Sequence, residues 1–402
     1  MVTKPLVNDT IQSMSLHPRI LLAVVVSMVT GIILGITLDL KLHGKNPSTK
    51  EGDFVLDLEA FESILNRISE SYVSPLNREE MLEDAVKGVL RGLDPHSVYL
   101  GKKAYSKLKN QSTGQFGGVG IKLTIEAGKL RVVNPISNTP AERAGILPGD
   151  ILVYIDRKPV EKNALQLALA KLRGKPGTSV SIGIERADQN EALEFKLIRA
   201  AINISSVQSR WLDDFAYLKI TQFQVDTGID AVKAINTMLV NPEHKMQGLI
   251  LDLRGNTGGV LQASVELVDA FLGEGKIVYT KGRRASSDVK YNASATDILG
   301  GLPIAILIDK DSASASEIVA GALQDHKRAL LMGSKSYGKG SVQTVMPLRN
   351  KHAIKLTTAL YYTPNGRVIN DVGLEPDIKI EAKENQDYLK VVVKEFTKAI
   401  NP

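Results

Sequence analysis

Two short segments hold the residues of this chain that are best suited to covalent chemistry. The first, Asp311–Glu317, alternates serine with alanine, follows the apolar run Leu302–Ile308 and leads into a helix-like stretch that reaches Leu323. A small hydroxyl residue at such a strand-to-helix turn is exposed, and the first N–H groups of the helix are unpaired where an oxyanion would form. The pattern predicts a serine nucleophile at this turn.

The second segment, Gly338–Gln343, supplies a candidate base. A serine hydroxyl is a poor nucleophile until a neighbouring group takes its proton. Lys339 is the candidate, because Gly338 and Gly340 let the backbone pack close around its amine, where desolvation disfavours the ammonium form. A lysine that works as a base near neutral pH needs its pKa lowered from about 10.4 to roughly 7 or 8, which requires a buried site.

Each segment also has a simpler interpretation. Ser312 or Ser316 could act only as the N-cap of the following helix. Gly333–Lys339 matches the start of a phosphate-binding loop, G-x-x-x-x-G-K, but Gly340 stands where that loop needs a Mg²⁺-binding Ser or Thr, which disfavours a nucleotide hydrolase. Asp252–Gly255 by itself is typical of an ordinary turn at a strand end.

Histidine is the more common base in such sites. The chain has 6 histidines, and His326 lies about three turns along the helix that begins near Ser314, so it points away from the helix start. A triad that uses His96, His244 or His352 stays open at this stage. The chain contains neither an H-E-x-x-H motif nor a cysteine, so we expect no metal site and no cofactor.

Taken together, the motifs resemble those of the carboxyl-terminal processing (tail-specific) proteases, which are serine peptidases that carry a PDZ domain. The resemblance extends from about Phe54 to Ile380, and the motifs occur in the order of the family. It implies an endopeptidase that recognises protein C-termini through its PDZ domain and acts on proteins or peptides with a free C-terminus. The matching motifs are Asp94–Leu100, Leu249–Gly259, Ser312–Glu317, Gly338–Gln343, Tyr361–Arg367 and Gly373–Asp377.

The resemblance assigns a role to three side chains. Ser314, the middle serine of its motif, matches the nucleophile, Lys339 matches the general base, and Gln343 matches the residue that orients the lysine. Their spacing puts Lys339 and Gln343 on one face, whether the stretch is a helix or a strand.

The same resemblance places the oxyanion hole at two turns. One donor would be the backbone N–H of Ala315, and the other would come from Gly258 or Gly259, between which the sequence does not choose. Thr257 stands where the family usually has proline, and it adds freedom to that turn without changing the chemistry.

A separate segment resembles a PDZ domain. It begins with Gly117-Gly118-Val119-Gly120 before a strand-like stretch, continues through Ala144–Leu152 and includes a helix near Ala164–Leu172. Glycines allow successive backbone N–H groups to turn toward the terminal carboxylate of a peptide, while the peptide adds as a strand to the sheet edge. We therefore predict that Gly117, Gly118, Val119 and Gly120 bind the peptide.

The amino terminus carries an uncharged apolar span from Ile20 to Leu38. Its length is about that needed to cross a bilayer and exceeds the apolar region of a cleaved secretory signal, so it predicts an uncleaved signal anchor. Lysines on both sides leave the orientation undecided by charge, but the resemblance implies that the catalytic part lies outside the cytoplasm. We expect a single-pass protein of the bacterial inner membrane whose catalytic domains face the periplasm.

Apolar periodicity predicts the elements that must position these residues. The chain of 402 residues, 43% of them hydrophobic, is long enough for more than one core. After about Ser205, strand-like and helix-like stretches alternate, which predicts an α/β core with reactive loops at the carboxyl ends of its strands. Predicted strands are Phe215–Ile220, Gly248–Leu253 and Pro303–Ile308, and predicted helices are Leu56–Tyr72, Arg78–Leu93, Asp230–Leu239 and Leu261–Leu272.

The predicted fold is therefore multidomain α/β, with an N-terminal membrane helix, a small helical cap, a β-rich PDZ domain and an α/β serine peptidase core. The parts are expected at residues 1–19 (short N-terminal segment), 20–38 (membrane anchor), 39–53 (linker), 54–112 (helical cap), 113–202 (PDZ domain), 203–380 (peptidase core) and 381–402 (a charged tail, expected as a surface helix).

Composition limits the other function classes. The net charge of +6 comes without a basic patch interleaved with aromatic residues, so nucleic acid is not indicated. The rival hypothesis is a catalytically silent PDZ scaffold that binds the C-terminal tails of envelope proteins and needs neither Ser314 nor Lys339. The sequence leaves open whether the protein forms homo-oligomers or uses an adaptor protein.

Overall fold

The computed structural model describes residues 51–187, 189, 191–294, 296–381 and 387–401. The chain divides into two compact units, the first ending at Ala85 and the second beginning at Val86. The predicted segments 1–19 and 20–38 lie outside the described residues. Within the described ranges, no helix is both long and apolar enough to cross a membrane.

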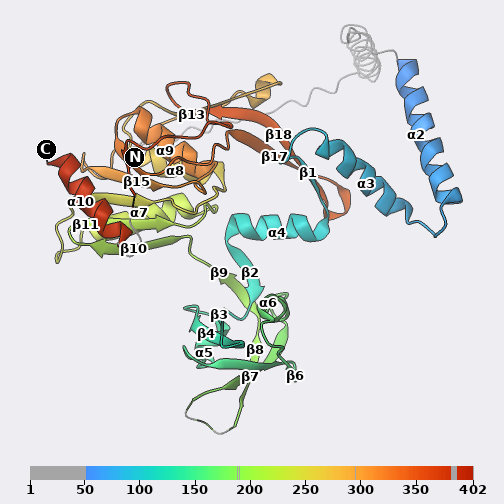
Figure 1. Ribbon diagram of the computed structural model, residues 1–402, viewed down its shortest axis with the longest axis horizontal. Helices are drawn as coiled ribbons and strands as arrows, with labels where there is room; N and C mark the ends of the chain where they lie inside the picture. Colours follow the sequence, from blue (N-terminus) through green and yellow to red (C-terminus); the bar gives the residue numbers. More distant parts are fainter. Residues whose placement is uncertain (1–50, 188, 190, 295, 382–386, 402) are drawn as a thin grey trace, which may run out of the picture. The chain divides into compact units, whose positions relative to one another are not determined.

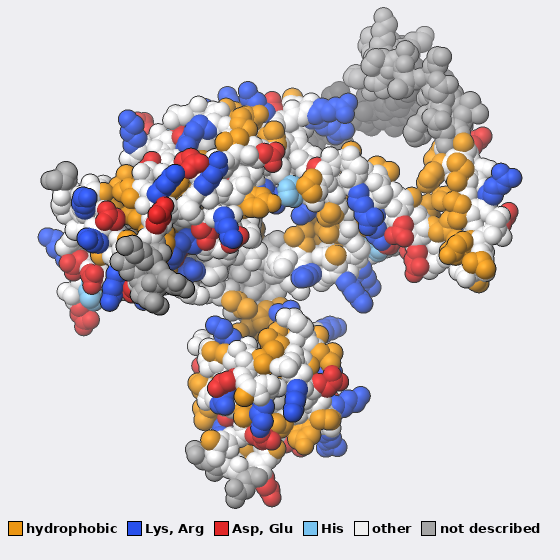
Figure 2. All heavy atoms as spheres, viewed as in Figure 1, with side chains coloured by type: hydrophobic (Ala, Val, Ile, Leu, Met, Phe, Trp, Pro, Cys, Tyr) orange, Lys and Arg blue, Asp and Glu red, His pale blue; other side chains and the backbone are white. Residues whose placement is uncertain are grey.

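Two helices follow the start of the described chain. They are α2 (Glu51–Ser71) and α3 (Arg78–Arg91), and they confirm the two helices that apolar spacing predicts here. Arg78 links them, because its Nη1 donates to Asn66 Oδ1 over 2.8 Å and its Nη2 pairs with Glu62 Oε1 at 3.0 Å. Apolar side chains gather along this part of the chain in Figure 2, and many of them are exposed.

The PDZ-like part is a small β-rich domain (Figure 1). Its antiparallel sheet has the order β3-β4-β5-β7-β8, with β6 beside β5, so β3 is an edge strand. Its core includes Leu130, Ile146 and Ile182, and the ribbon of β2 and β9 joins it to the rest of the unit. The bounds are β2 (Gln115–Gly118), β3 (Ile121–Glu126), β4 (Lys129–Pro135), α5 (Pro140–Arg143), β5 (Ile151–Ile155), β6 (Lys158–Pro159), α6 (Leu165–Leu172), β7 (Ser179–Glu185), β8 (Leu193–Ile198) and β9 (Ala200–Asn203).

The α/β core is built on a six-stranded sheet of order β10-β11-β12-β15-β16-β19. Only the β10–β11 pair is antiparallel within this sheet. Strands β11, β12 and β15 confirm the three predicted strands, and they are buried at almost every position, as parallel strands covered on both faces are. The bounds are β10 (Val207–Leu212), β11 (Phe215–Ile220), β12 (Gly248–Asp252), β15 (Ile304–Ile308), β16 (Ala329–Gly333) and β19 (Ile378–Lys379).

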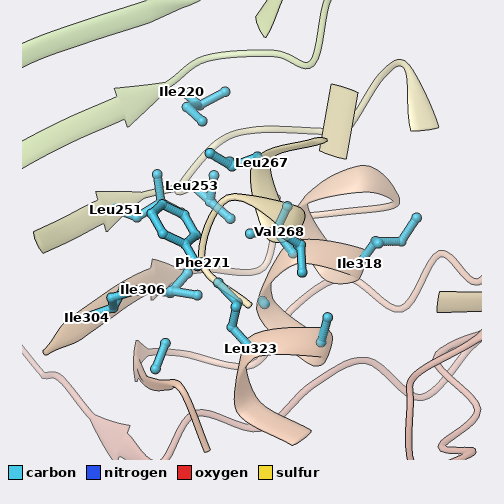
Figure 3. Packing of buried hydrophobic residues seen from close by; sticks show 14 of the residues in the cluster. Ile220, Leu251, Leu253, Leu267, Val268, Phe271, Ile304, Ile306, Ile318 and Leu323 are labelled. Carbon is cyan, nitrogen blue, oxygen red and sulfur yellow. The ribbon is translucent and has the colours of Figure 1, made fainter. Parts of the chain in front are cut away.

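Three helices cover one face of this sheet: α7 (Thr227–Leu239), α8 (Leu261–Asp269) and α9 (Ala315–Asp325). The first two confirm predicted helices. Figure 3 shows how sheet residues such as Leu251 pack against Val268 of α8 and against α9 in one continuous cluster. This close packing holds the start of α9 rigidly against the sheet edge.

The C-terminal helix α10 (Tyr388–Ile400) covers the opposite face of the same sheet. A helix was predicted in this tail, but the prediction that it lies on the surface is wrong. Val392 and Phe396 are 0% exposed, and the Phe396 ring lies 5.2 Å from the ring of Phe215. Charged residues are spread along the tail sequence, but the apolar side chains of α10, among them Val392 and Phe396 one helical turn apart, form a face that packs on the sheet.

A second sheet, which sequence periodicity does not predict, forms around the long strand β18 (Ala353–Tyr362). This strand pairs antiparallel with β1, β13 and β17, and β14 extends the sheet beyond β13. Residue Val98 of β1 faces Lys355 of β18 in the register. The remaining bounds are β1 (Val98–Leu100), α4 (Lys102–Thr113), β13 (Lys276–Gly282), β14 (Lys290–Asn292) and β17 (Ser341–Pro347), with short 3₁₀ turns at Ala285–Ser287 and Arg349–Lys351.

Candidate active site

Three loops meet at the carboxyl edge of the core sheet. Strand β12 ends at Asp252, β15 at Ile308 and β16 at Gly333, and these strands are neighbours. Parallel strands place their carboxyl ends along one edge, so the loops that follow them lie side by side. The Gly255 N–H donates to the Asp309 carboxylate over 3.0 Å and joins the first two loops. The predicted position of the reactive loops at strand ends is confirmed.

Ser314 immediately precedes α9 in a strained turn. Its φ of 57° and ψ of −115° form a combination that residues with a side chain avoid. Such a conformation costs on the order of 1–3 kcal/mol and persists only where the surroundings hold it. Here the Ser314 N–H donates to Glu317 Oε2 over 2.8 Å, and the Ser314 carbonyl accepts the N–H groups of Glu317 and Ile318 over 2.8 and 3.0 Å.

The two neighbouring serines have structural partners. Ser312 Oγ donates to the Leu253 carbonyl over 2.9 Å, and Ser316 Oγ donates to the Asn256 carbonyl over 2.9 Å. Both residues are 0% exposed. They hold the serine turn against the loop after β12, so neither serves as the N-cap, and Ser314 occupies that position.

The glycine turn lies directly against the serine turn. Gly258 has a φ of +96°, and a Cβ added to it would lie 2.7 Å from the Ser314 Cβ and 2.9 Å from the Ala315 nitrogen. Gly259 has a φ of +147°, and a Cβ added there would collide with the Phe223 carbonyl. Both positions therefore require glycine, for space as well as for backbone conformation.

Asn256 fixes the shape of this glycine turn, a role that sequence reasoning missed. It is 0% exposed, its Nδ2 donates to the Ile220 carbonyl over 2.9 Å, and its Oδ1 accepts the Gly258 N–H over 2.9 Å. Its carbonyl accepts the Ala313 N–H over 3.0 Å. An asparagine two residues before paired glycines was the available signal, because an asparagine side chain often hydrogen-bonds the backbone two residues further on.

Lys339 lies between β16 and β17, with its backbone held at both ends. Its N–H donates to Glu317 Oε2 over 2.8 Å, and its carbonyl accepts a hydrogen bond from the Tyr361 hydroxyl. Burial lowers the pKa of the Lys339 amine, the charge of Lys355 lowers it further, and the charge of Glu317 opposes both. Among the described residues, the amine has no carboxylate partner. The surroundings therefore make the neutral amine, the form that can accept a proton, easier to reach than in a free lysine.

A cavity of about 380 Å³ unites the predicted residues. It lies where the glycine turn, the serine turn and the lysine segment converge, and its walls also include apolar side chains such as Leu261 and Val342. Six predicted residues line it together: Ser314, Lys339, Gln343, Ala315, Gly258 and Gly259.

Gln343 lies in this cavity with partners other than the lysine. Its Nε2 donates to Ser341 Oγ over 2.8 Å and to Thr357 Oγ1 over 3.4 Å. The β17–β18 register shifts between Val342 and Gln343, so the regular alternation expected of a strand is interrupted beside it. The role of Gln343 in orienting Lys339 stays a prediction.

Tyr361 of β18 is a second residue that sequence reasoning left without a role. It is 2% exposed, lines the cavity and donates its hydroxyl hydrogen to the Lys339 carbonyl. Burial raises the pKa of Tyr361 well above its ordinary value, the charge of Glu317 raises it further, and a hydrogen bond with Ser314 acts in the other direction. The phenol therefore stays neutral at working pH and serves as a hydrogen-bond donor.

None of the four histidines in the described chain lines the cavity. Burial and the nearby charge of Lys339 lower the pKa of His96. The other three have different partners: His244 stacks on Trp211 with ring centroids 4.5 Å apart, His326 Nε2 lies 2.7 Å from the Lys276 carbonyl oxygen, and His352 Nδ1 lies 2.6 Å from the Tyr99 hydroxyl.

The glycine-rich segment of the PDZ domain divides between two environments. Gly117 and Gly118 belong to β2 and pair with β9, whereas Val119 is 2% exposed and packs in the domain core. Gly120 precedes β3 with a φ of +83°, and its carbonyl accepts the Ile136 N–H over 2.8 Å. The peptide-binding role of the four residues stays a prediction.

Comparison with known proteins gives two family matches. Residues 214–380 match peptidase family S41, and residues 117–197 match the PDZ domain. These matches cover the α/β core that carries the cavity and the small β-rich domain. Fold and site thus define a serine-type peptidase that carries a PDZ domain.

Individual relatives narrow the assignment. A carboxy-terminal-processing protease of Bartonella bacilliformis (strain ATCC 35685 / KC583 / Herrer 020/F12,63) is 38% identical over 367 residues, which are 90% of this chain and 84% of that protein. The carboxy-terminal processing protease CtpB of Bacillus subtilis (strain 168) is 34% identical over 342 residues, 83% of this chain and 70% of that protein. A solved structure of a photosystem II D1 C-terminal processing protease aligns at 26% identity over 80% of this chain and 92% of its own, with a TM-score of 0.48. On the sequence matches, the chain belongs to the carboxy-terminal processing protease family.

Proposed function

We propose that this peptidase uses Ser314 as its nucleophile and Lys339 as its general base. The observation that supports the pair most directly is the cavity that both line, in which the amine is partly buried and has a lowered pKa. The neutral amine takes the proton of Ser314 Oγ–H while Oγ bonds to the carbonyl carbon of the peptide. The ammonium then protonates the leaving amine, the C–N bond breaks, and an acyl-serine remains. Water, deprotonated by the same amine, hydrolyses this ester.

The oxyanion hole is assigned to Ala315 and Gly259. Gly258 already donates its N–H to Asn256 Oδ1, whereas the N–H groups of Ala315 and Gly259 donate to no carbonyl among the residues that the structure describes. Both free donors belong to residues that line the cavity. Preorganised N–H groups of this kind stabilise the tetrahedral intermediate, and losing one typically costs about 100- to 1,000-fold in kcat.

Gln343 is retained as the residue that orients Lys339. Its amide nitrogen is held by Ser341, which fixes the amide within the cavity. Its oxygen accepts no hydrogen bond from a described residue and is therefore available to the lysine amine. This would aim the amine lone pair at Ser314.

Single-turnover cleavage of an unstructured protein with an apolar free C-terminus tests the pair. Ser314→Ala and Lys339→Arg should both abolish turnover, the second because guanidinium keeps the charge but does not deprotonate at usable pH. The rate of the natural enzyme should rise with pH through the lowered Lys339 pKa. Substituting His96, His244, His326 or His352 one at a time should leave substantial activity. An active Lys339→Arg enzyme, or an inactive histidine variant that folds normally, would show that another group is the base.

We further propose that the PDZ domain captures the free C-terminus of protein substrates. Strand β3 is an edge of its sheet, so its outer side can accept a peptide as an added strand, and Gly120 opens the turn just before it. Amidation of a peptide C-terminus should then weaken binding by more than about 1 kcal/mol, the order of a charge-assisted hydrogen bond. Calorimetry that finds equal affinity for amidated and free-acid peptides would contradict this.

The proposed setting is the bacterial envelope. It rests on the uncharged span Ile20–Leu38, which is long enough to anchor the chain in the inner membrane with the peptidase in the periplasm and envelope proteins as substrates. The mature protein should stay with membranes after a high-salt wash and should be digested by protease added to cells with a permeabilised outer membrane. A soluble species that starts near residue 40 would show that the span is cleaved.

A further inference from the structure

Glu317 has a buried carboxylate that no cation among the described residues neutralises by an ion pair. The residue is 0% exposed, and within the described part of the chain no lysine or arginine side chain forms an ion pair with it. A buried carboxylate needs hydrogen bonds in compensation. It has four: Oε1 accepts Ser336 Oγ–H at 2.6 Å and the Gly338 N–H at 2.7 Å, and Oε2 accepts the Ser314 N–H and the Lys339 N–H, each at 2.8 Å.

One oxygen atom of Glu317 therefore joins the main chains of the nucleophile and the base. Ser314 belongs to the loop after β15 and Lys339 to the loop after β16, and each makes its N–H bond to the same Oε2. The Tyr361 hydroxyl holds the carbonyl of Lys339 from the other side. The spacing of the two segments is thus set by a shared acceptor on α9.

The chemistry of this acceptor requires a carboxylate of this length. Two ionised oxygens offer about four acceptor sites, one for each donor found here. Glutamine has the same shape, but its NH₂ group would face two hydrogen donors. Aspartate keeps the charge, but it is one methylene too short to reach both loops from the same position on α9.

We propose that Glu317 is a positioning residue for the peptidase reaction, whose carboxylate holds the Ser314 turn and the Lys339 segment at the spacing that proton transfer requires. The proposal rests on the proposed function, because it takes Ser314 and Lys339 as the reacting pair. It goes beyond a helix-capping role for Glu317, which would account for the bond to Ser314 but not for the three bonds to Ser336, Gly338 and Lys339.

The test compares kcat and KM of Glu317→Gln and Glu317→Asp in the full chain, with an unstructured substrate that has a free apolar C-terminus. Both variants should lose about 100-fold in kcat, the usual effect of moving reacting groups by about 1 Å. KM should change by less than about threefold, because the peptide-binding surfaces are untouched. Wild-type kcat in either folded variant would overturn the proposal.

The pH profile separates positioning from general loosening of the site. Glu317 raises the pKa of Lys339, so Glu317→Gln should move the pH of half-maximal rate downward, while Glu317→Asp keeps it near the wild-type value. The other charged or titratable groups around Lys339, namely Lys355, His96 and Tyr361, are unchanged in both variants. A site that is merely loosened would admit water to the amine and move the midpoint upward, and that result would also overturn the proposal.

Asp325→Asn is the matched control. Asp325 lies at the other end of the same helix, its side chain is 4% exposed, and it pairs with Arg367 at 2.6 Å. This variant should lower thermal stability and leave kcat of the folded enzyme within about twofold. An equal loss of kcat in Asp325→Asn would mean that any buried carboxylate on α9 has this effect, which would overturn the specific role of Glu317.

Two further variants complete the test. One serves if neither Glu317 variant folds, and the other tests the premise that Ser314 and Lys339 are the reacting pair. If neither Glu317 variant folds, Ser336→Ala removes one of the four donors and leaves the carboxylate, and kcat should fall about three- to tenfold. An unchanged kcat in Ser336→Ala would then overturn the proposal. Activity in Ser314→Ala would refute the proposed dyad itself, whereas an inactive Ser314→Ala beside fully active Glu317 variants would refute only the positioning role.

Discussion

Replacing Gly258 with alanine measures how closely the glycine turn must approach the nucleophile. The new Cβ would lie 2.7 Å from both the Ser314 Cβ and the Ala313 carbonyl oxygen, and 2.9 Å from the Ala315 nitrogen. Ordinary contact begins near 3.4 Å, so one of the two turns must move by about 0.7 Å, the difference between 3.4 and 2.7 Å. Main-chain atoms and a Cβ cannot rotate away, so the displacement falls on the serine turn or on the oxyanion donors.

A shift of this size should lower kcat by about 10- to 100-fold, or roughly 1.4–2.7 kcal/mol in activation free energy. The positive φ of Gly258 adds about 1–2 kcal/mol of lost stability when a side chain is present. Single-turnover cleavage measures the first effect, and urea unfolding measures the second.

Gly255→Ala is the control for this substitution. Gly255 lies in the same loop with a φ of +71°, but a Cβ added to it has no heavy atom within 4 Å. It should therefore lose about 1 kcal/mol of stability and keep kcat within about twofold. Wild-type kcat in Gly258→Ala, or an equal loss in Gly255→Ala, would refute the reasoning from contact distance.

Three other perturbations test separate parts of the structure. Lys355→Met should move the pH of half-maximal rate upward, because the charge of Lys355 lowers the pKa of Lys339 and the rate rises as that amine loses its proton. An unchanged or lower midpoint in the pH–rate profile would contradict this. Burial raises the pKa of Asp252, but hydrogen bonds, chiefly from Arg254, outweigh burial and hold the pKa below its ordinary value. The stability that the ionised Asp252 contributes is therefore present above about pH 4 and is lost as the pH falls further. Asp252→Asn should therefore lower the free energy of unfolding by about 3 kcal/mol at pH 7. Urea unfolding should show that the difference between wild type and variant shrinks below about pH 4. A difference that does not change with pH would mean that the ionised carboxylate is not its cause. Phe396→Ala should cost about 3–5 kcal/mol in urea unfolding and leave kcat of the folded enzyme unchanged, whereas a loss below about 1 kcal/mol would mean that α10 is not part of the core.

The parallel strands and the loops that follow them could be predicted from the sequence. The runs that form β11, β12 and β15 are short, apolar and bounded by turn residues, which is typical of strands covered on both faces. The glycine turn and the serine turn directly follow two of these strands, β12 and β15, in the sequence. Their convergence at one edge then comes from the general geometry of parallel sheets.

The second sheet could not be predicted in the same way. Most positions of β18 are only partly buried, so the strand shows neither a continuous apolar run nor a strict alternation. Its long-range pairings, such as Val98 with Lys355, leave no mark in local periodicity. The position of Lys355 in the cavity wall could therefore not be predicted from the sequence.

The roles of individual side chains could also be predicted from the sequence only in part. Ser314 and Lys339 stand in distinctive short motifs, and a resemblance of motifs is enough to select them. Glu317 and Tyr361 also stand in short family motifs, but their importance lies in bonds to residues about twenty positions away, which only the folded chain brings together. Spacing alone also could not show that Gln343 bonds Ser341, because the register shift beside it is a local irregularity.

The pairing of β1 with β18 has a consequence for the time at which the enzyme becomes active. Strand β1 leaves the ribosome early, but its partner, which also carries part of the cavity wall, is among the last strands to be made. Contacts between residues so distant in sequence form late in folding, because the chain must lose the entropy of closing a long loop before these contacts can stabilise it. A chain that is still being synthesised therefore lacks the part of the cavity wall that β18 supplies. We therefore expect cleavage activity to appear only after β18 has been synthesised and has paired with β1.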